Sequence, residues 1–317
     1  MRDLATEFEA ERSHLTAVAY RMLGSRAEAE DAVQETWLRY SGALADPAAR
    51  AQVRDLRGWL TTTVGRICLD VLRSARVRRE AYPGQWLPEP LVSRLPDGGP
   101  DPSELAARSD EVSMALLVVL ERLTPEQRVA FVLHDVFAVP FDEIANAMGT
   151  TVDAARQLAS RARRAVADGP PKHTADLAEQ RRLVAAFFTA VESGDVDELL
   201  AVLAPDAVMI GDGGGAFPAA GRPLSGAAEV ARFVLGLFKQ SGKLMLEVRA
   251  APVAVNGGFG IQVDGIYKDG RPFRGVMAFA VADGHITGVF NQISPVKMQA
   301  VPPLPTEGTA WPPPGLS

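Results

Sequence analysis

The sequence has very few of the residues that form disulfides and metal sites. Cys68 is the only cysteine among 317 residues, which excludes an intrachain disulfide and a cluster of thiolate ligands. The four histidines are scattered, and no two of them stand at the spacing of metal ligands on a helix. We therefore expect no metal site and no cofactor.

Long hydrophobic runs are also missing. The longest strongly apolar stretch, Met114–Leu120, is far shorter than the roughly 20 residues that a membrane-spanning helix needs. The first residues, Met1–Glu7, lack the apolar segment of a signal peptide. With 47% hydrophobic and 23% charged residues the composition is globular, and the length suits two or three domains. The sequence predicts a cytoplasmic protein without a membrane partner.

Lysine is absent from the first half of the chain, where every basic residue before Lys172 is arginine. Two explanations are open. A GC-rich genome favours arginine, and so does a surface that binds DNA, because the planar guanidinium group fits phosphates and guanine edges. The net charge of −6 argues against a passive, histone-like DNA binder but does not exclude a local basic surface.

Hydrophobic periodicity predicts two separate all-α domains before residue 170. Apolar residues at helical spacing indicate a small helical domain over residues 1–79. Prolines and glycines interrupt residues 80–104, which we interpret as a linker, although its tryptophan and leucines favour docking over a free tether. A second helical domain follows over residues 105–168, and Gly149 marks the turn of a helix-turn-helix.

The remaining sequence predicts an α+β domain and a tail. Helical patterns near residues 177–239 precede strand patterns up to residue 293, and turns such as Asn256–Gly258 separate consecutive strands. Over residues 175–299 we expect a cone-shaped domain, in which a curved antiparallel sheet wraps helices around a cavity that could bind a small ligand. The proline-rich tail, residues 300–317, is predicted to be disordered.

The second helix of the helix-turn-helix carries the strongest chemical signal. Ala155, Ala159 and Ala162 repeat at helical spacing and turn one face inward, which leaves arginine and glutamine residues outside. Such a helix can enter a DNA major groove, where arginine pairs with guanine and glutamine with adenine. The alternative is an ordinary helical hairpin with a solvated arginine face.

Two surfaces of the first domain carry weaker signals. The helix near residues 56–79 is rich in hydroxyl groups and arginine, so it could hold a single DNA strand by phosphate contacts and stacking. It could equally be a solvated face with Trp59 in the core. The acidic residues near Glu28–Glu35 could dock a partner, or could simply be favoured at a helix start by the helix dipole.

These segments resemble the extracytoplasmic-function sigma factors of bacterial RNA polymerase. Ala29–Trp37 and Gly58–Arg73 are similar to sigma region 2, and Leu123–Arg163 is similar to region 4, with nothing like regions 1 or 3. The resemblance covers about residues 5–168. It implies that the chain is a sigma factor that brings core polymerase to promoter DNA, with region 2 on the clamp of the β′ subunit and region 4 on the β flap.

The resemblance also assigns functional residues. For the −35 promoter element it implies Thr151, Asp153, Arg156, Gln157, Ser160, Arg161, Arg163 and Arg164. For the −10 element it implies Trp59, Thr62, Arg66, Arg73 and Arg76, and for polymerase binding Asp31, Gln34, Glu35 and Trp37.

The second half resembles a subgroup whose members carry a SnoaL-like C-terminal extension. Its marks are a Trp-Leu-Pro-Glu-Pro linker, an Asp-Gly-Gly-Gly segment and a late motif that is degenerate here at Ser294–Met298, where Pro295 and Lys297 are kept. The resemblance implies that the extension acts in cis in place of a separate anti-sigma factor. The residues implied are Tyr82, Trp86, Leu87, Pro88, Glu89, Pro90, Asp212, Gly213, Gly214, Gly215 and Lys297.

An enzymatic function is the alternative for this domain, since SnoaL-like domains include cyclases and isomerases. Asp212, Asp264 and His285 are the candidates for proton transfer, but they form no paired arrangement in the sequence, so we predict no catalytic residues. A DNA-binding ligand sensor, or a cyclase fused to a helix-turn-helix, is the competing hypothesis. Such a protein would not need the first helical domain.

Overall fold

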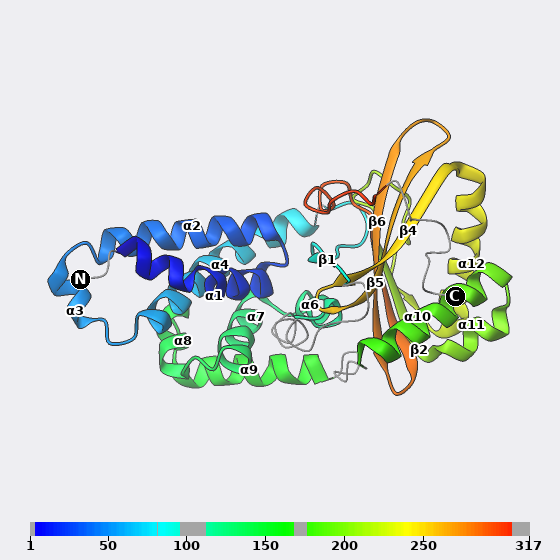
Figure 1. The fold of residues 1–317 in the computed structure, drawn as a ribbon. Coiled ribbons are helices and arrows are strands. Elements are labelled where there is room, and N and C mark those ends of the chain that lie inside the picture. Colours follow the sequence, from blue (N-terminus) through cyan, green and yellow to red (C-terminus); the bar gives the residue numbers. More distant parts are fainter. Residues whose placement is uncertain (1–3, 81, 96–111, 168–175, 306–317) are drawn as a thin grey trace. The chain divides into compact units, whose positions relative to one another are not determined.

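The computed structural model describes residues 4–80, 82–95, 112–167 and 176–305 (Figure 1). They divide into two compact units, which are described separately. The first contains residues up to 81 together with residues 119–169, and the second contains residues 82–118 together with those from 170 onward. In the described ranges, no helix is both long and apolar enough to span a bilayer.

The first unit begins with α1 (Leu4–Leu23), α2 (Arg26–Ala43), α3 (Pro47–Gln52) and α4 (Leu56–Glu80). The long helices α1, α2 and α4 pack on one another through buried apolar residues, and the Ser25 side chain caps α2. The helices predicted in this segment are present, but they share one compact unit with residues 119–169. The six-residue helix α3 was not predicted, because it is too short to show periodicity.

The same unit contains α7 (Pro125–Phe131), a π-helical turn η1 (Val132–Val136), α8 (Phe141–Met148) and α9 (Val152–Ala167). Thr124 and Gln127 form a capping box at the start of α7. Gly149 ends α8 in the left-handed conformation, and α9 buries its alanine face. The predicted helix-turn-helix is confirmed in α8 and α9.

The second unit combines α10 (Leu177–Ser193), α11 (Val196–Val202) and α12 (Ala227–Leu244) with a seven-stranded sheet. The strands follow the order β1-β4-β5-β6-β7-β2-β3. Their bounds are β1 (Val92–Arg94), β2 (Leu203–Asp212), β3 (Leu224–Ser225), β4 (Met245–Val255), β5 (Gly258–Tyr267), β6 (Pro272–Ala282) and β7 (His285–Gln292).

The sheet is mixed, which corrects the prediction of an antiparallel sheet. Strands β4 to β7 form the expected meander, but β2 pairs with β7 in parallel. The turn residues in the sequence predict only hairpins between strands that are consecutive in the chain. The parallel pairing joins Met209 to Val289 across a long crossover, and no local pattern encodes such a contact.

Each face of the sheet has its own core. One face packs on α10, α11 and α12 through residues such as Phe187, Val230 and Phe279. The other face, around Ile210 and Phe290, is covered by three segments, two of which precede the predicted domain. The covering residues are Leu87 of the linker, Met114 and Val118 of α6 (Met114–Leu120), and Met298 and Val301 after β7.

Two boundaries consequently differ from the sequence analysis. The linker was expected over residues 80–104, yet Val92–Arg94 form β1 and extend the edge of the sheet beside β4. Disorder was expected from residue 300, yet Val301 and Leu304 are buried. Most of the remaining linker, residues 96–104, and of the remaining tail, residues 306–317, lies outside the described residues.

Candidate functional site: a linker held on the C-terminal sheet

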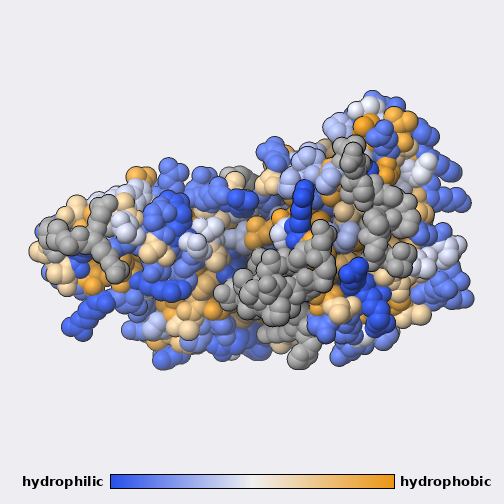
Figure 2. All heavy atoms as spheres, in the orientation of Figure 1, coloured by the Kyte–Doolittle hydropathy of each residue, from blue (hydrophilic) through white to orange (hydrophobic). Residues whose placement is uncertain are grey.

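The polar surface of α9 carries all but one of the residues predicted for the −35 element. Ala155, Ala159 and Ala162 are buried, which leaves the predicted residues of the helix exposed, and Figure 2 shows hydrophilic residues over this helix. Thr151 precedes the helix and accepts a hydrogen bond from the Ala154 amide, so it also caps α9. Arg156 pairs with Asp153 of the same helix at 3.1 Å.

The residues predicted for the −10 element lie along α4. Trp59, Thr62 and Arg66 line a groove of about 490 Å³, and Glu143 of α8 forms part of its wall. Arg73 lies further along α4 and pairs with Glu126 of α7 at 3.0 Å. The side chain of the fifth residue, Arg76, lies outside the described residues.

The residues predicted to bind polymerase differ in their environments. Asp31 and Gln34 are exposed on α2, whereas Glu35 pairs with Arg39 one turn later. Trp37 packs on Phe8, with ring centroids 5.2 Å apart, so part of its side chain belongs to the core. On the exposed side stands Leu38, with 58% of its surface accessible, which the sequence analysis did not select.

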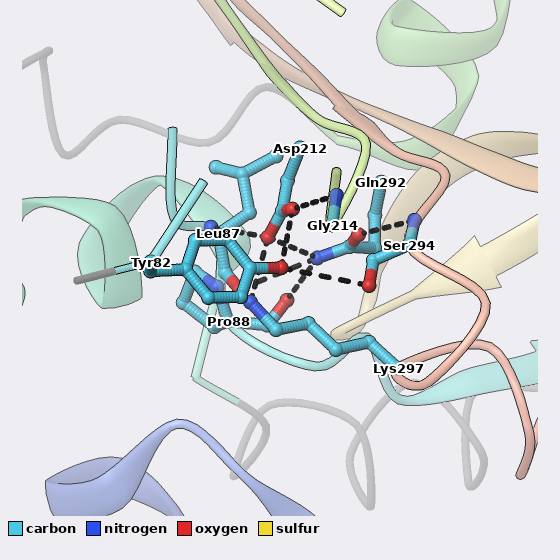
Figure 3. Close-up of polar contacts among 8 residues, drawn as sticks. All are labelled: Tyr82, Leu87, Pro88, Asp212, Gly214, Gln292, Ser294 and Lys297. Carbon is cyan, nitrogen blue, oxygen red and sulfur yellow. Dashed lines mark hydrogen bonds and ion pairs between the residues drawn. The ribbon is translucent and has the colours of Figure 1, made fainter. Parts of the chain in front are cut away.

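The second unit binds the linker through a group of five residues, Tyr82, Leu87, Asp212, Gln292 and Lys297, here called the linker-binding cluster (Figure 3). Asp212 is fully buried at the end of β2. Its carboxylate accepts hydrogen bonds from the Tyr82 hydroxyl at 2.8 Å and the Leu87 amide at 2.9 Å. One carboxylate therefore holds the linker at two points.

Lys297 neutralises this buried carboxylate. Its Nζ lies 2.6 Å from Asp212 Oδ2 and donates a second bond, also 2.6 Å, to the Leu87 carbonyl. The same ammonium lies 3.1 Å from the centroid of the Trp86 ring and 4.8 Å from that of Tyr82. Such cation–π contacts are strongest where water is excluded, and Lys297 is only 8% exposed.

Burial and the negative charge of Asp212 also raise the pKa of Tyr82. Burial, together with the hydrogen bond to Asp212 and the charge of that carboxylate, raises the pKa of the Tyr82 phenol to about 12, while the hydrogen bond to Ser294 opposes the change. The phenol therefore stays a neutral donor throughout the physiological range. A donor that cannot lose its proton is suited to hold a buried carboxylate permanently.

Steric contacts explain why the three residues after Asp212 are glycines. A Cβ atom on Gly213 would lie 2.0 Å from the Phe217 carbonyl oxygen, because the chain folds back tightly there. Gly214 has a φ of +59° and donates its amide proton to Asp212, and its Cβ would collide with Ser294. A Cβ on Gly215 would lie 2.9 Å from Pro83 of the linker. Of the three predicted glycines, Gly215 thus contacts the linker, and Gly214 binds the Asp212 carboxylate that holds it.

The remaining predicted linker residues lie on the sheet as well. Pro88 and Pro90 are buried and Glu89 is half-buried. Further along, the Leu91 amide donates to the Asn256 side chain, and the Asn256 amide donates back to the Leu91 carbonyl. Val92–Arg94 thus add a strand to the sheet edge, the mode by which sheet edges bind peptides, whereas Leu87 and Pro88 are bound through their main chain by side chains of the domain.

Sequence reasoning missed two members of this site. Gln292 donates to Asp212 and to the carbonyls of Leu87 and Pro88, and Asn256 binds Leu91. The sequence did contain a signal for Gln292. It stands two residues after Phe290 in the same strand, so both side chains lie on one face and Gln292 puts an amide among apolar residues. At the degenerate motif, Lys297 contacts the linker, whereas Val296 is 74% exposed.

A second polar group on the same face holds the segment after β7. Asp264 binds Arg274 through two hydrogen bonds of 3.0 Å and accepts the Leu304 amide at 2.9 Å. Arg274 also donates to the Val301 carbonyl, and Gln262 donates to the Pro302 carbonyl. Burial raises the pKa of Asp264, but the hydrogen bonds from Arg274, Leu304 and Gln262 outweigh burial and hold that pKa below its ordinary value.

The three carboxylate and imidazole groups considered for catalysis have separate roles. Asp212 binds the linker and Asp264 binds the tail segment, whereas His285 is exposed at a turn with its Nδ1 2.9 Å from the Asp283 carbonyl oxygen. The structure thus gives each of them a contact that leaves no shared proton-transfer pair. Within the described ranges, no three His, Cys, Asp or Glu side chains gather as a metal site.

Comparison with known proteins finds three domain families in the chain. The family model of sigma-70 region 2 matches residues 8–78, that of sigma-70 region 4 matches residues 113–166, and a SnoaL-like domain matches residues 184–289. These matches confirm the predicted fold class of two helical sigma domains followed by a SnoaL-like domain.

Individual relatives give the same result. The chain is 42% identical to the ECF RNA polymerase sigma factor SigJ of Mycobacterium tuberculosis strain H37Rv over 303 residues, 94% of each chain. It is 38% identical to the probable ECF RNA polymerase sigma factor SigI of M. tuberculosis strain CDC 1551 over 210 residues, 64% of this chain and 67% of that protein. The crystal structure of M. tuberculosis SigJ matches with a TM-score of 0.71 and 40% identity, covering 93% of this chain and 98% of that one.

Removing one charge of the Asp212–Lys297 pair should cost more than removing both. Lys297→Met leaves a buried, uncompensated carboxylate, so the free energy of unfolding should fall by about 3–5 kcal/mol, and Asp212→Asn should also destabilise. The double variant should lose clearly less than the sum of the two. Urea unfolding measures these values, with Lys268→Met, an exposed lysine, as the matched control. Additive losses would show that the two side chains do not interact.

The stabilisation by Asp264 should depend on pH. Because its folded-state pKa is depressed, its contribution is complete above the unfolded-state pKa and is lost as the pH falls through the folded-state value. Asp264→Asn should therefore lower the free energy of unfolding by about 1.5–3 kcal/mol at pH 7 and have a shrinking effect toward pH 2. Urea titrations across this range test the trend, with the exposed Asp283→Asn as control. A difference independent of pH would contradict it.

Proposed function

The chain belongs to the extracytoplasmic-function RNA polymerase sigma factors, and we propose that it directs core polymerase to promoters while its own C-terminal domain restrains it. The observation that carries the first part is the order of sigma regions 2 and 4 in this chain, together with its match to a sigma factor over 94% of both chains. The observation that carries the second is the buried cluster that binds the linker between these regions.

We assign −35 recognition to the exposed face of α9. Gln157 and Ser160 are exposed on the same face as Arg156, where side chains of a recognition helix reach base edges. Arg161, Arg163 and Arg164 lie nearer the end of the helix and suit phosphate contacts. Arg163 pairs at present with Asp135 at 2.6 Å, so binding DNA through this residue exchanges one anionic partner for another.

We assign promoter melting and polymerase binding to the first domain. Trp59, Thr62 and Arg66 offer an aromatic ring, a hydroxyl group and a cation in one groove, a combination that suits an unstacked base and its phosphate. Arg73 would leave Glu126 to contact DNA. On α2, Asp31, Gln34, Glu35 and Leu38 follow helical spacing along one side, and the exposed Leu38 extends the predicted clamp-binding face.

The restraint follows from where the linker ends are held. The docked residues 82–95 lie on the sheet, and Met114 and Val118, at the start of region 4, pack into the same core as Leu87. An extended residue spans at most about 3.3–3.6 Å, so docking of residues 82–95 removes roughly 45–50 Å from the reach of the linker. Regions 2 and 4 must separate to contact two promoter elements at once, and the docked linker opposes this separation.

This assignment gives the C-terminal domain a regulatory function rather than an enzymatic one. It takes the place of a separate anti-sigma factor, because the contacts that hold the linker are part of the same chain. Partners are core polymerase, through its β′ clamp and β flap, and promoter DNA, which place the protein in the cytoplasm where transcription occurs.

Promoter-specific run-off transcription with purified core polymerase tests the sigma activity, and two variants of α9 test its recognition helix. Arg164→Ala should weaken binding on all promoters and reduce the slope of log affinity against log salt by about 1. Gln157→Ala should cost about 1–3 kcal/mol and relax the choice of one base. No stimulation by the wild-type chain on any cellular promoter would overturn the proposal.

The same assay tests the restraint. Lys297→Met should release the linker, which increases hydrogen exchange at the Leu87 amide, and should raise run-off output several-fold. The control is Lys268→Met, which removes an exposed lysine from the same domain. Output equal to that of the wild type, from a variant whose Leu87 amide demonstrably exchanges faster, would refute restraint in cis.

A further inference from the structure

The outer flank of α12 carries a groove that the linker does not use. The groove has a volume of about 440 Å³ and lies between α12 and the loop that follows the three glycines. Its apolar surface comes from Pro218, Phe233 and Leu237, and its cations are Arg232, Lys239 and Lys243.

This groove is separate from the interior of the cone. On α12, the core of the domain buries Val230, Ala231 and Val234. At 100° per residue, Arg232, Gly236 and Lys243 point to the opposite side of the helix. The polar side of the groove therefore faces away from the apolar core between α12 and the sheet.

The residues that line the groove include three cations and no carboxylate, although Arg232 also interacts with the nearby Glu229. Within the described ranges, neither Lys239 nor Lys243 lies within 4.0 Å of a carboxylate oxygen, and Arg232 donates from Nε to the carbonyl of Ala228. Lysines in a last helical turn are favoured by the helix dipole, which accounts for Lys243 alone. Arg232 and Lys239 lie outside the first and last turns of α12, so the dipole does not account for these two cations.

We propose that this groove binds a small organic anion with an apolar body, such as a medium-chain carboxylate. Phe233 and Leu237 would cover the apolar part, and the three cations would surround the anionic group. Gly236 contributes to the fit, because a Cβ built on it meets nothing within 4 Å and its place in the groove is open space. The occupant is chosen by charge complementarity.

The groove and the linker contact are two ends of one tight turn. Gly213 accepts hydrogen bonds from the amides of Ala216 and Phe217, so the turn is compact. Asp212 at its start binds the linker, and Pro218 at its end lines the groove. Occupancy of the groove therefore changes how firmly the linker is held. This coupling rests on the proposed restraint, whereas binding to the groove does not.

Calorimetric titration of the full-length chain with decanoate tests the site, with decan-1-ol as the uncharged comparison. Decanoate should bind at least ten-fold more tightly than decan-1-ol. Lys239→Gln/Lys243→Gln should weaken decanoate binding at least ten-fold, whereas Lys268→Gln, an exposed lysine elsewhere on the domain, should leave it unchanged. Gly236→Phe should abolish binding by filling the open space without touching the core.

Equal binding by the wild type and the groove variants would overturn the inference, as would equal binding of decanoate and decan-1-ol. Displacement of decanoate by a short oligothymidylate, with tighter binding of the DNA, would also overturn it by making the groove a phosphodiester site.

Hydrogen exchange of residues 84–95, with and without decanoate, tests the coupling separately. A change at the Leu87 amide on saturation supports it, and binding without any change overturns the coupling while the site stands. Lys297→Met serves as the reference for a released linker. If that variant exchanges like the wild type without ligand, the proposed restraint fails, and this result is independent of whether decanoate binds.

Discussion

A single buried carboxylate organises the regulatory half of this protein. Asp212 has no exposed surface, and its two oxygens accept hydrogen bonds from a linker hydroxyl, a linker amide, a glycine amide, a glutamine and a lysine. Burying a charge is costly unless it is paired and fully hydrogen-bonded, so every one of these donors must be present together. Because two donors come from residues 82–87, the domain completes its own core only when the linker is bound. Such a pair contributes more to a unique arrangement than to net stability.

The same face repeats this chemistry for a second segment. Gln292 and Lys297 bind linker carbonyls, while Gln262, Arg274 and Asp264 bind the main chain of residues 301–304. A sheet face would ordinarily be covered by a helix with an apolar stripe. Here α6 shares the cover with non-helical segments, whose backbone brings amides and carbonyls that must be satisfied. The polar side chains on this otherwise apolar face therefore exist to bind backbone.

The sequence predicted what is local and missed what is distant. The helix-turn-helix was evident because the alanine periodicity of α9, the Thr124 cap and the Gly149 turn all lie within one segment. Tyr82, Asp212 and Lys297 were selected by resemblance, but their meeting joins residues up to 210 apart in contacts such as Lys297 to Leu87. Gln292 escaped because a lone amide in a strand is ordinary until its apolar neighbours are known. The parallel pairing of β2 with β7 escaped for the same reason, since only tertiary structure brings these strands together.

The separation of Asp212 and Lys297 from the linker also sets a sequence of events in time. Regions 2 and 4 are complete by about residue 168, whereas the lysine that neutralises the carboxylate is residue 297. Bacterial ribosomes add about 5–20 residues each second, so a nascent chain presents both sigma regions for about ten seconds before the linker can be held. Under the proposed restraint, newly made protein would be active for this short period, so the activity of a molecule would depend on the time since its synthesis.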